Sequence, residues 1–391
     1  MNSSMEILED HIETLKGFAF KSSLYSVSGI PIVKVSDFTQ DSVTLDKISF
    51  IPVENGPDFE KYKLKKGDVL IQTVGSWEHN PNSVVGKVVR IPEILNDSLL
   101  NQNIVRIIPK ATLENQFLYY LLRNDVFKNY IINTAQGAAN QASITLESIR
   151  AFKFNYKNKS TQYKIASILS AYDDLIENNF KRIKLLEEST KLSYKLLMES
   201  ESLSEIRLSR IASVNELSMK ANSQLEKIIY IDISSVTEGS INEKREYDLK
   251  DAPGRAKRIV KHEDIIWSCV RPNRKSFSMV WLPEENLIVS TGFAVITSKK
   301  IPSTFLYQSI TTDEFVKYLE ANAKGAAYPA VGSKEFEDAK LLLPSDVAMI
   351  EYHQKHSVSF TLINNLQKQN AKLREARDIL LPRLMSGEIE V

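Results

Sequence analysis

The sequence has few of the residues that build disulfides and metal sites. It contains one cysteine, Cys269, and five histidines among 391 residues. One cysteine excludes an internal disulfide, and the scattered histidines show no spacing that is typical of zinc sites. The first ten residues, MNSSMEILED, are acidic and lack the apolar segment of a signal peptide. We therefore expect a protein without a metal in a reducing compartment, the cytoplasm.

The sequence also lacks a large net charge and a long apolar run. Lys and Arg total 50 against 49 Asp and Glu, so the net charge is +1. This balance excludes a uniformly basic coat for nucleic acid, so a binding surface for nucleic acid would have to be local. No apolar run approaches the length of a membrane span, and we expect no membrane partner. The apolar fraction of 43% is enough to bury the cores of two or three domains.

Common catalytic motifs are missing as well. A phosphate-binding loop needs Gly-Lys followed by Ser or Thr, but Val88 follows the pair Gly86-Lys87. The Gly-x-Gly-x-x-Gly motif of dinucleotide-binding folds is absent. The string NPNS at 80–83 lacks the second proline and the aromatic residue of an amino-methyltransferase loop, and PDFEK at 57–61 has no strand between its carboxylates. The residues favour binding over catalysis.

What the sequence does contain is a long duplication. The segments TAQGAANQAS (134–143) and NAKGAAYPAV (322–331) align with each other, Gly137 opposite Gly325. Two other pairs of segments resemble each other in the same order: 65–73 with 261–269, and 173–188 with 360–375. A repeat unit that spans almost half of the chain indicates a duplicated module and not a short-repeat solenoid.

Each module shows the same order of elements. Short β-branched runs between turn residues predict strands, and a helical stretch follows at 115–131 in the first copy and 303–320 in the second. Each module ends in a long helix, predicted to begin after Ser160 and after Pro344, the latter capped by Ser345 or Asp346. The predicted fold class is α+β, with two mixed domains separated by two long helices and related by a pseudo-twofold axis.

The long helices carry apolar residues at heptad spacing. These seam residues are Leu169, Ile176 and Ile183 in the first helix and Leu362, Leu366, Leu373 and Leu380 in the second. The pattern predicts an antiparallel coiled coil that also serves as a platform for a partner, although two helices packed on their own domains would give a similar pattern. The expected boundaries are 1–158 and 203–344 for the two mixed domains, and 159–202 and 345–391 for the helical regions.

Two loops in each module are candidates for binding. In the second module they carry mainly basic and aromatic side chains: Arg255, Arg258, Arg271, Asn273, Arg274, Lys275, Lys324, Tyr328 and Lys334. In the first module they carry mainly amides and hydroxyls: Gln72, Ser76, Trp77, His79, Asn80, Lys87, Asn140, Gln141 and Ser143. Arg and Lys can neutralise phosphates, and Arg, Asn and Gln can bond to base edges. Both loops could equally be ordinary solvated hairpins, and the Gly-Ala-Ala segment is either a DNA-facing loop or a tight internal turn.

The whole chain resembles a specificity subunit of a Type I restriction–modification system. The resemblance rests on the duplication together with three segments: LKGFAFKSSLY…GIPIVKVSDF (15–38), STQYKIASILSAYDDLIENN (160–179) and LREARDILLPRLMSGEIEV (373–391). It implies two target recognition domains, each reading one half of a bipartite site in double-stranded DNA. One difference is that the second glycine segment has Tyr328-Pro329 where the first has Asn140-Gln141, which argues against a common mode of contact for the two loops.

The resemblance also implies the partners and cofactors. Two modification subunits, which are adenine N6-methyltransferases that bind S-adenosylmethionine, would dock on the helices. Two restriction subunits with ATP and Mg²⁺ would join them where the host supplies these subunits. No cofactor is expected in this chain. Two alternatives are a fused catalytic nuclease or methyltransferase, and a coiled-coil adaptor without a role on DNA.

Overall fold

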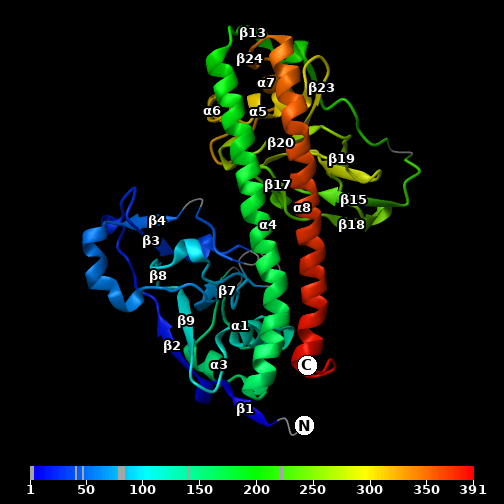
Figure 1. Cartoon of the computed structure of the whole chain (residues 1–391). Helices are drawn as coiled ribbons and strands as arrows, with labels where there is room; N and C mark the ends of the chain where they lie inside the picture. Colours follow the sequence, from blue (N-terminus) through cyan, green and yellow to red (C-terminus); the bar gives the residue numbers. More distant parts are fainter. Residues whose placement is uncertain (1–3, 40–41, 46–47, 78–83, 139–140, 221–222) are drawn as a thin grey trace. The chain divides into compact units, whose positions relative to one another are not determined.

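The computed structural model divides the chain into two compact units. Unit 1 contains residues 1–177 and 370–391, and unit 2 contains residues 178–369 (Figure 1). Each unit therefore combines one mixed domain with one part of each long helix. The residues that the structure describes are 4–39, 42–45, 48–77, 84–138, 141–220 and 223–391.

The described strands of unit 1 are β1 (Met5–Ile7), β2 (Ile12–Lys16), β3 (Ile30–Val33), β4 (Ser49–Ile51), β5 (Val69–Gln72), β6 (Val74–Gly75), β7 (Val88–Arg90), β8 (Leu99–Leu100), β9 (Ile104–Pro109), β10 (Gln136–Ala138), β11 (Gln141–Ser143) and β12 (Lys153–Asn155). The largest sheet has the order β2-β9-β5-β7 and is antiparallel. Three smaller sheets have the orders β4-β3-β8, β10-β11-β6 and β1-β12. Every residue of β5 is buried, which fits its near-continuous apolar sequence.

Short helices cover the large sheet of unit 1. They are α1 (Asn115–Arg123), α2 (Asp125–Asn133) and α3 (Leu146–Arg150). The single helical stretch predicted at 115–131 is thus two helices. Asn124 ends α1 with extended backbone angles, and its side chain accepts a hydrogen bond from the Val126 amide to cap α2.

The described strands of unit 2 are β13 (Ser204–Arg207), β14 (Ala212–Val214), β15 (Lys227–Ile231), β16 (Val236–Thr237), β17 (Ser240–Ile241), β18 (Arg245–Asp248), β19 (Ala256–Ile259), β20 (Ile265–Ser268), β21 (Phe277–Met279), β22 (Leu287–Ser290), β23 (Phe293–Ser298) and β24 (Lys340–Leu343). They form sheets with the orders β14-β23-β20-β21, β18-β15-β22-β19, β13-β24 and β16-β17. The helices are α5 (Ser303–Ser309), α6 (Asp313–Asn322) and α7 (Ser333–Glu337). The stretch predicted at 303–320 is again two helices, with the Thr312 side chain capping α6.

The two units repeat the same topology, which supports the predicted duplication. Sheet β2-β9-β5-β7 of unit 1 corresponds to β14-β23-β20-β21 of unit 2, and the pair β1-β12 corresponds to β13-β24. In both units a parallel pair accompanies the main sheet: β3 with β8, and β15 with β22. The three short helices follow in the same order.

The long helices are α4 (Lys159–Ser200) and α8 (Asp346–Ser386). Their starts lie close to the predicted positions. Asn158 caps α4 by accepting the Thr161 amide at 3.0 Å, and Ser345 caps α8 by accepting the Ala348 amide at 3.3 Å. In the described part of the chain, no helix is both long and apolar enough to span a membrane.

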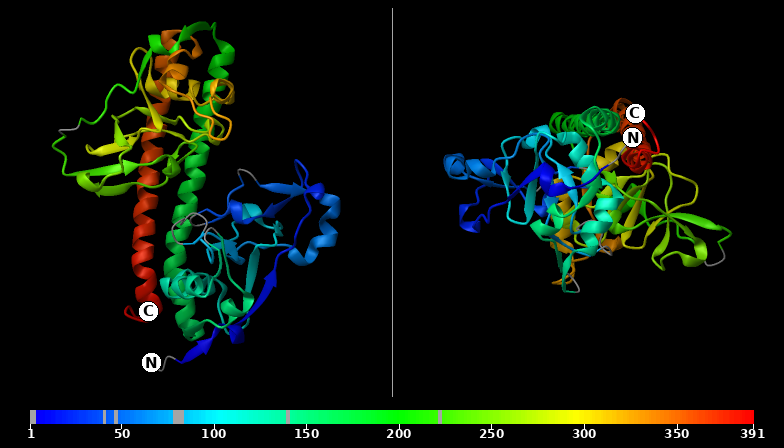
Figure 2. Two further views of the ribbon diagram at one scale, coloured as in Figure 1. Left: turned by 180° about the vertical axis from the view of Figure 1, so that it is seen from behind. Right: turned by 90° about the horizontal axis from the view of Figure 1, so that it is seen from below.

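In unit 1, α4 and α8 pack together and against the mixed domain. The core holds Leu169 of α4 together with Leu381, Leu384 and Met385 of α8 and side chains of the large sheet. Residues 389 and 391 also pack on this core, so the chain after α8 lies at the same end of unit 1 as β1 (Figure 2). Leu380 of the predicted seam is half-buried against the core, while the three core residues of α8 lie outside the predicted rows.

A buried ion pair joins the two helices in unit 1. The Asp173 carboxylate of α4 accepts hydrogen bonds at 2.6 Å from both the Arg377 guanidinium of α8 and the Tyr120 hydroxyl of α1. Arg90 of β7 lies 3.5 Å from the same carboxylate. The Arg377 side chain is only 1% exposed, so this charge depends on its partners inside the protein.

In unit 2, the same helices pair through the predicted seam. Ile183 of α4 packs with Ile363 and Leu366 of α8, and Leu186 and Leu362 flank this cluster. Ile176 of unit 1 is buried as well, while Leu373 is half-buried. The predicted pairing of the two helices is therefore confirmed in each unit. The seam residues are mostly covered by this pairing, so they offer little surface to a partner.

Candidate nucleic-acid interface

The two candidate loops of unit 1 meet in one small sheet. Strand β6, which follows β5, pairs with β11 of the Gly-Ala-Ala hairpin, with Val74 opposite Ser143 and Gly75 opposite Ala142. The amide of Ile144 donates to the Thr73 carbonyl at 3.0 Å and continues the pairing. Two segments that are far apart in the sequence thus form one surface at the end of the buried strand.

The glycine of this hairpin is required by an internal contact. Gly137 has φ +151°, and a Cβ atom there would lie 2.0 Å from the carbonyl oxygen of Gln141. No other residue fits without moving the hairpin backbone. Of the two alternatives for the Gly-Ala-Ala segment, the tight internal turn explains the glycine, and the turn leaves the side chains of Gln141 and Ser143 exposed.

The other candidates of unit 1 are placed differently. Gln72 is buried, and its side-chain amide donates to the Val74 carbonyl at 2.9 Å, so this side chain supports the loop from inside. Ser76 is buried and pairs with Val84, and Trp77 is half-buried against the core. Lys87 is half-buried on the neighbouring segment. The candidates His79, Asn80 and Asn140 lie outside the described residues.

The equivalent loops of unit 2 meet in the same way. Val270, just after β20, pairs with Ala330, and the amide of Val331 donates to the Cys269 carbonyl at 2.9 Å. The Arg271 amide donates to the Pro329 carbonyl at 2.7 Å. Gly325 has φ +96°, as expected for a second tight hairpin turn.

This pairing places Arg271 of unit 2 where unit 1 has Gly75. It also places Tyr328 where unit 1 has Gln141 and Pro329 where it has Ala142. The sequence alignment, which set Tyr328-Pro329 against Asn140-Gln141, is therefore shifted by one position, because the second hairpin is shorter by one residue between its glycine and the paired segment.

On this surface the half-buried Arg271 contacts the exposed Tyr328. The guanidinium carbon of Arg271 lies 4.6 Å from the centre of the Tyr328 ring, and this ring is 70% exposed. The Arg271 Nη2 atom donates to the Ala327 carbonyl at 3.4 Å. A cation over an aromatic face is attracted by the ring quadrupole, which holds the arginine across the hairpin.

A short 3₁₀ turn, Pro272–Arg274, and Lys275 directly after it carry the remaining basic side chains of this loop. Both residues that flank it are in the left-handed region, with φ +51° at Arg271 and φ +52° at Lys275. Lys275 donates to the Asp313 carboxylate of α6 at 2.6 Å, and this hydrogen bond lowers the pKa of Asp313. Lys275 therefore anchors the turn, while Asn273 and Arg274 are exposed. No sequence signal marked Asp313, which lies on a different element from its partner.

Two other arginines lie on β19 and beside it. Arg255 is exposed, and its carbonyl accepts the Thr291 amide at 2.8 Å. The next residue, Gly292, accepts the Cys269 amide at 2.8 Å, so the backbone connects Arg255 to the Arg271 loop. Arg258 is half-buried and donates to the Ser218 hydroxyl at 3.0 Å, which assigns it a supporting contact.

The two candidate lysines flank the hairpin of unit 2. Lys324 pairs with Ala330 through its backbone, and its exposed ammonium lies 3.7 Å from the Glu335 carboxylate. Lys334 is exposed on α7. Within the described ranges, no group of three or more His, Cys, Asp or Glu side chains could hold a metal ion. The site offers hydrogen-bond donors and cations, which are groups that bind nucleic acid and do not by themselves supply catalysis.

Comparisons with known proteins agree with this geometry. The sequence model of the family described as "Type I restriction modification DNA specificity domain" matches residues 7–188. The MjaX type I restriction enzyme specificity subunit of Methanocaldococcus jannaschii is 25% identical and the match covers 98% of this chain and 93% of that protein. The HindI specificity subunit of Haemophilus influenzae is 23% identical, covering 86% and 90%.

A solved structure shares the fold. The S subunit of the Type I restriction–modification system from M. genitalium superposes with a TM-score of 0.55 at 16% identity, covering 98% of this chain and 96% of that one. The matching duplication, helix pair and relatives lead to one assignment. The chain carries a specificity domain of Type I restriction–modification systems over residues 7–188 and is similar over almost its whole length to their specificity subunits.

Proposed function

We propose that each unit reads one half of a bipartite site in double-stranded DNA through its pair of meeting loops. One observation carries this proposal: the backbone pairing is the same in both units, while the side chains on it differ. Unit 1 presents the amide of Gln141 and the hydroxyl of Ser143, and unit 2 presents Arg271 and Tyr328. A repeated frame with different side chains suits two half-sites of different sequence.

The side chains on these loops have the chemistry that DNA recognition needs. Glutamine can bond adenine through two hydrogen bonds, and arginine can bond guanine in the same manner. The exposed cations Arg255, Arg274 and Lys324 can neutralise phosphates and fix the position of unit 2 on the duplex. The specificity subunit thereby directs the complex to its DNA sequence without carrying out the reaction.

We further propose that two copies of a methyltransferase partner dock on the helices, one on each unit. When the duplicated segments 173–188 and 360–375 are aligned, two exposed apolar positions of α4 recur on α8. Tyr163 is 58% exposed and corresponds to Ile350, which is 47% exposed; Leu192 is 58% exposed and corresponds to Ile379, which is 51% exposed. Unit 1 thus holds Tyr163 with Ile379, and unit 2 holds Ile350 with Leu192. The same two apolar positions, exposed in both units, fit the same partner bound twice.

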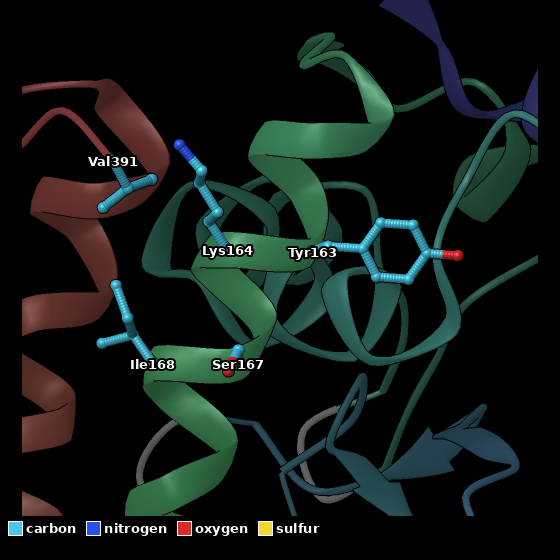
Figure 3. A pocket seen from close by; sticks show the side chains of 5 residues that line it. All are labelled: Tyr163, Lys164, Ser167, Ile168 and Val391. Atoms are coloured by element: carbon cyan, nitrogen blue, oxygen red, sulfur yellow. The ribbon is translucent and has the colours of Figure 1, made fainter.

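A close view of unit 1 shows the surroundings of Tyr163 (Figure 3). An open depression of about 490 Å³ is lined by Tyr163, Lys164, Ser167 and Ile168 of α4 and by Val391. Ile168 and Lys164 extend toward Val391, whereas the Tyr163 ring points away from it (Figure 3). Tyr163 is therefore available on a side of α4 that the end of the chain does not cover. We expect S-adenosylmethionine to be held by the partner bound there.

The DNA proposal is tested by mapping methylated adenines in cells with and without this chain. We expect methylation at a two-part motif only when the chain is present. A set of methylated sites that is independent of the chain would contradict the proposal.

The partner proposal is tested by native mass spectrometry of the complex. Tyr163→Glu combined with Ile379→Glu should remove one methyltransferase copy and leave the other on unit 2. The matched control is Val27→Glu, because Val27 is 97% exposed and lies outside the helices. If both copies remain on the double variant, the partner docks elsewhere.

A further inference from the structure

We propose that Arg271, held over the ring of Tyr328, reads a guanine in the half-site of unit 2. The inference rests on the proposed reading of DNA by the meeting loops and names one base and one side chain within it. Three features fix the guanidinium group: the backbone of Arg271, the ring of Tyr328 and a carbonyl of the hairpin.

The backbone fixes the base of the Arg271 side chain. Arg271 has φ +51°, a conformation that residues other than glycine adopt rarely. It is held there from both sides, because its amide donates to Pro329 at 2.7 Å and its carbonyl accepts the Arg274 amide at 2.9 Å. Such conformations persist only where the surroundings impose them, and they gather at functional sites.

The hairpin then fixes the guanidinium group. Its carbon atom lies 4.6 Å from the Tyr328 ring centre, and Nη2 donates to the Ala327 carbonyl at 3.4 Å. This hydrogen bond uses one of the five N–H donors of the guanidinium group and leaves others that can bond to a base. Tyr328 is a positioning residue, since its exposed ring supplies the platform and not the contact to the base.

The comparison between units favours a base over a phosphate. Phosphates are the same in every duplex, so a contact to a phosphate carries no sequence preference of its own. Unit 1 instead has Gly75 at the position of Arg271 and Gln141 at that of Tyr328, and neither is a cation. Where the side chains of the two units differ on the same backbone frame, the units can also differ in the DNA sequence that they prefer. Guanine O6 and N7 form the paired acceptors that a fixed arginine fork matches.

The test uses the full chain assembled with its methyltransferase partner and a pool of duplexes randomised at both half-sites. Arg271→Lys keeps the positive charge that a phosphate contact needs and removes the forked N–H donors that a guanine contact needs. The variant therefore distinguishes a contact to a base from a contact to a phosphate. Tyr328→Phe keeps the platform, and Tyr328→Ala removes it. The matched control is Arg207→Lys, because Arg207 is an exposed arginine on β13 that pairs with Asp338.

We expect the wild-type complex to select guanine at one position of one half-site. Arg271→Lys should lower that preference roughly 5- to 150-fold, and leave the other positions and the salt dependence unchanged. Tyr328→Ala should weaken the same preference, and Tyr328→Phe and the control should retain it. A wild-type motif that Arg271→Lys leaves unaltered overturns this inference alone. A further variant, Arg271→Gln, removes the charge. If it weakens the binding of all DNA sequences equally and flattens the salt dependence, the arginine contacts a phosphate and the inference is again overturned. A wild-type complex that selects no motif overturns the proposed function as well.

Discussion

Removing one member of the buried ion pair in unit 1 should cost far more stability than removing both. Asp173 and Arg377 lie 2.6 Å apart, with side chains 10% and 1% exposed. Asp173→Asn keeps the shape of the side chain and removes its charge, which leaves the Arg377 guanidinium without its buried carboxylate. Breaking a buried pair in this way costs about 3–5 kcal/mol.

The double variant Asp173→Asn with Arg377→Met removes both charges and keeps the volume of the stem. Replacing a buried pair by uncharged residues of similar size is often neutral, so we expect the double variant to lose much less stability than Asp173→Asn alone, even though both variants also remove this carboxylate from Arg90. Unit 2 supports this expectation, because its residues at the corresponding positions, Phe360 and Thr190, are uncharged and buried.

Urea denaturation of the full chain measures the free energies of all variants, and hydrogen exchange of residues 159–177 locates the change in unit 1. The reasoning is refuted if the single variant is as stable as the wild type. It is equally refuted if the stability that the double variant loses equals the sum of the losses of Asp173→Asn and of Arg377→Met alone. The two charges would then act independently.

A buried carboxyl group and a hairpin glycine lead to two more predictions. Burial raises the pKa of Glu187 on α4 to about 7, from an ordinary value of 4.5. The folded state disfavours the ionised carboxylate, so its contribution to stability is greatest below about pH 4.5 and is lost as the pH rises through 7. Glu187→Gln should therefore stabilise the protein at pH 8 by up to about 3 kcal/mol and give no gain near pH 4. Thermal unfolding at each pH measures this difference. Equal effects of the substitution at pH 4 and pH 8 would contradict the assigned pKa. Gly137→Ala places a Cβ atom 2.0 Å from a backbone oxygen and should disturb the hairpin at a cost of about 1–3 kcal/mol, with loss of selection at one half-site only. Gly254→Ala is its control, because the space around that Cβ position is open, and equal motifs from both variants would show that the hairpin does not read DNA.

The sequence was sufficient for the features that depend on periodicity and repetition. The duplication, the order of strands and helices, and the pairing of α4 with α8 all follow from patterns that extend over many turns and strands. The predicted starts of α4 and α8 lie close to the observed ones because Asn158 and Ser345 are residues that commonly cap helices. Local capping also explains a detail that the pattern did not give, since Asn124 divides the predicted helical stretch into α1 and α2.

The details of the candidate interface could not be read from the sequence. The contact of Arg271 with Tyr328 and the ion pair of Lys275 with Asp313 join segments that are far apart in the chain and have no shared periodicity. The shift of one position between the two hairpins is visible only through the backbone pairing. Gln72 illustrates another limit of the sequence, from which its side chain was a candidate for DNA contact. A polar residue at the end of an apolar strand can instead bond to its own loop and lie buried, as Gln72 does.

The division of the chain between the units has a consequence for its synthesis. Unit 2 is a continuous segment, residues 178–369, and all of it has been made before the last helix turns emerge from the ribosome. Unit 1 begins at the N-terminus, yet its core includes Leu381, Leu384 and Met385. The first domain to be translated is therefore the last to be completed, and until then its apolar surface has no cover. A stop codon just after residue 369 would leave unit 2 whole and would damage the domain at the opposite end of the gene.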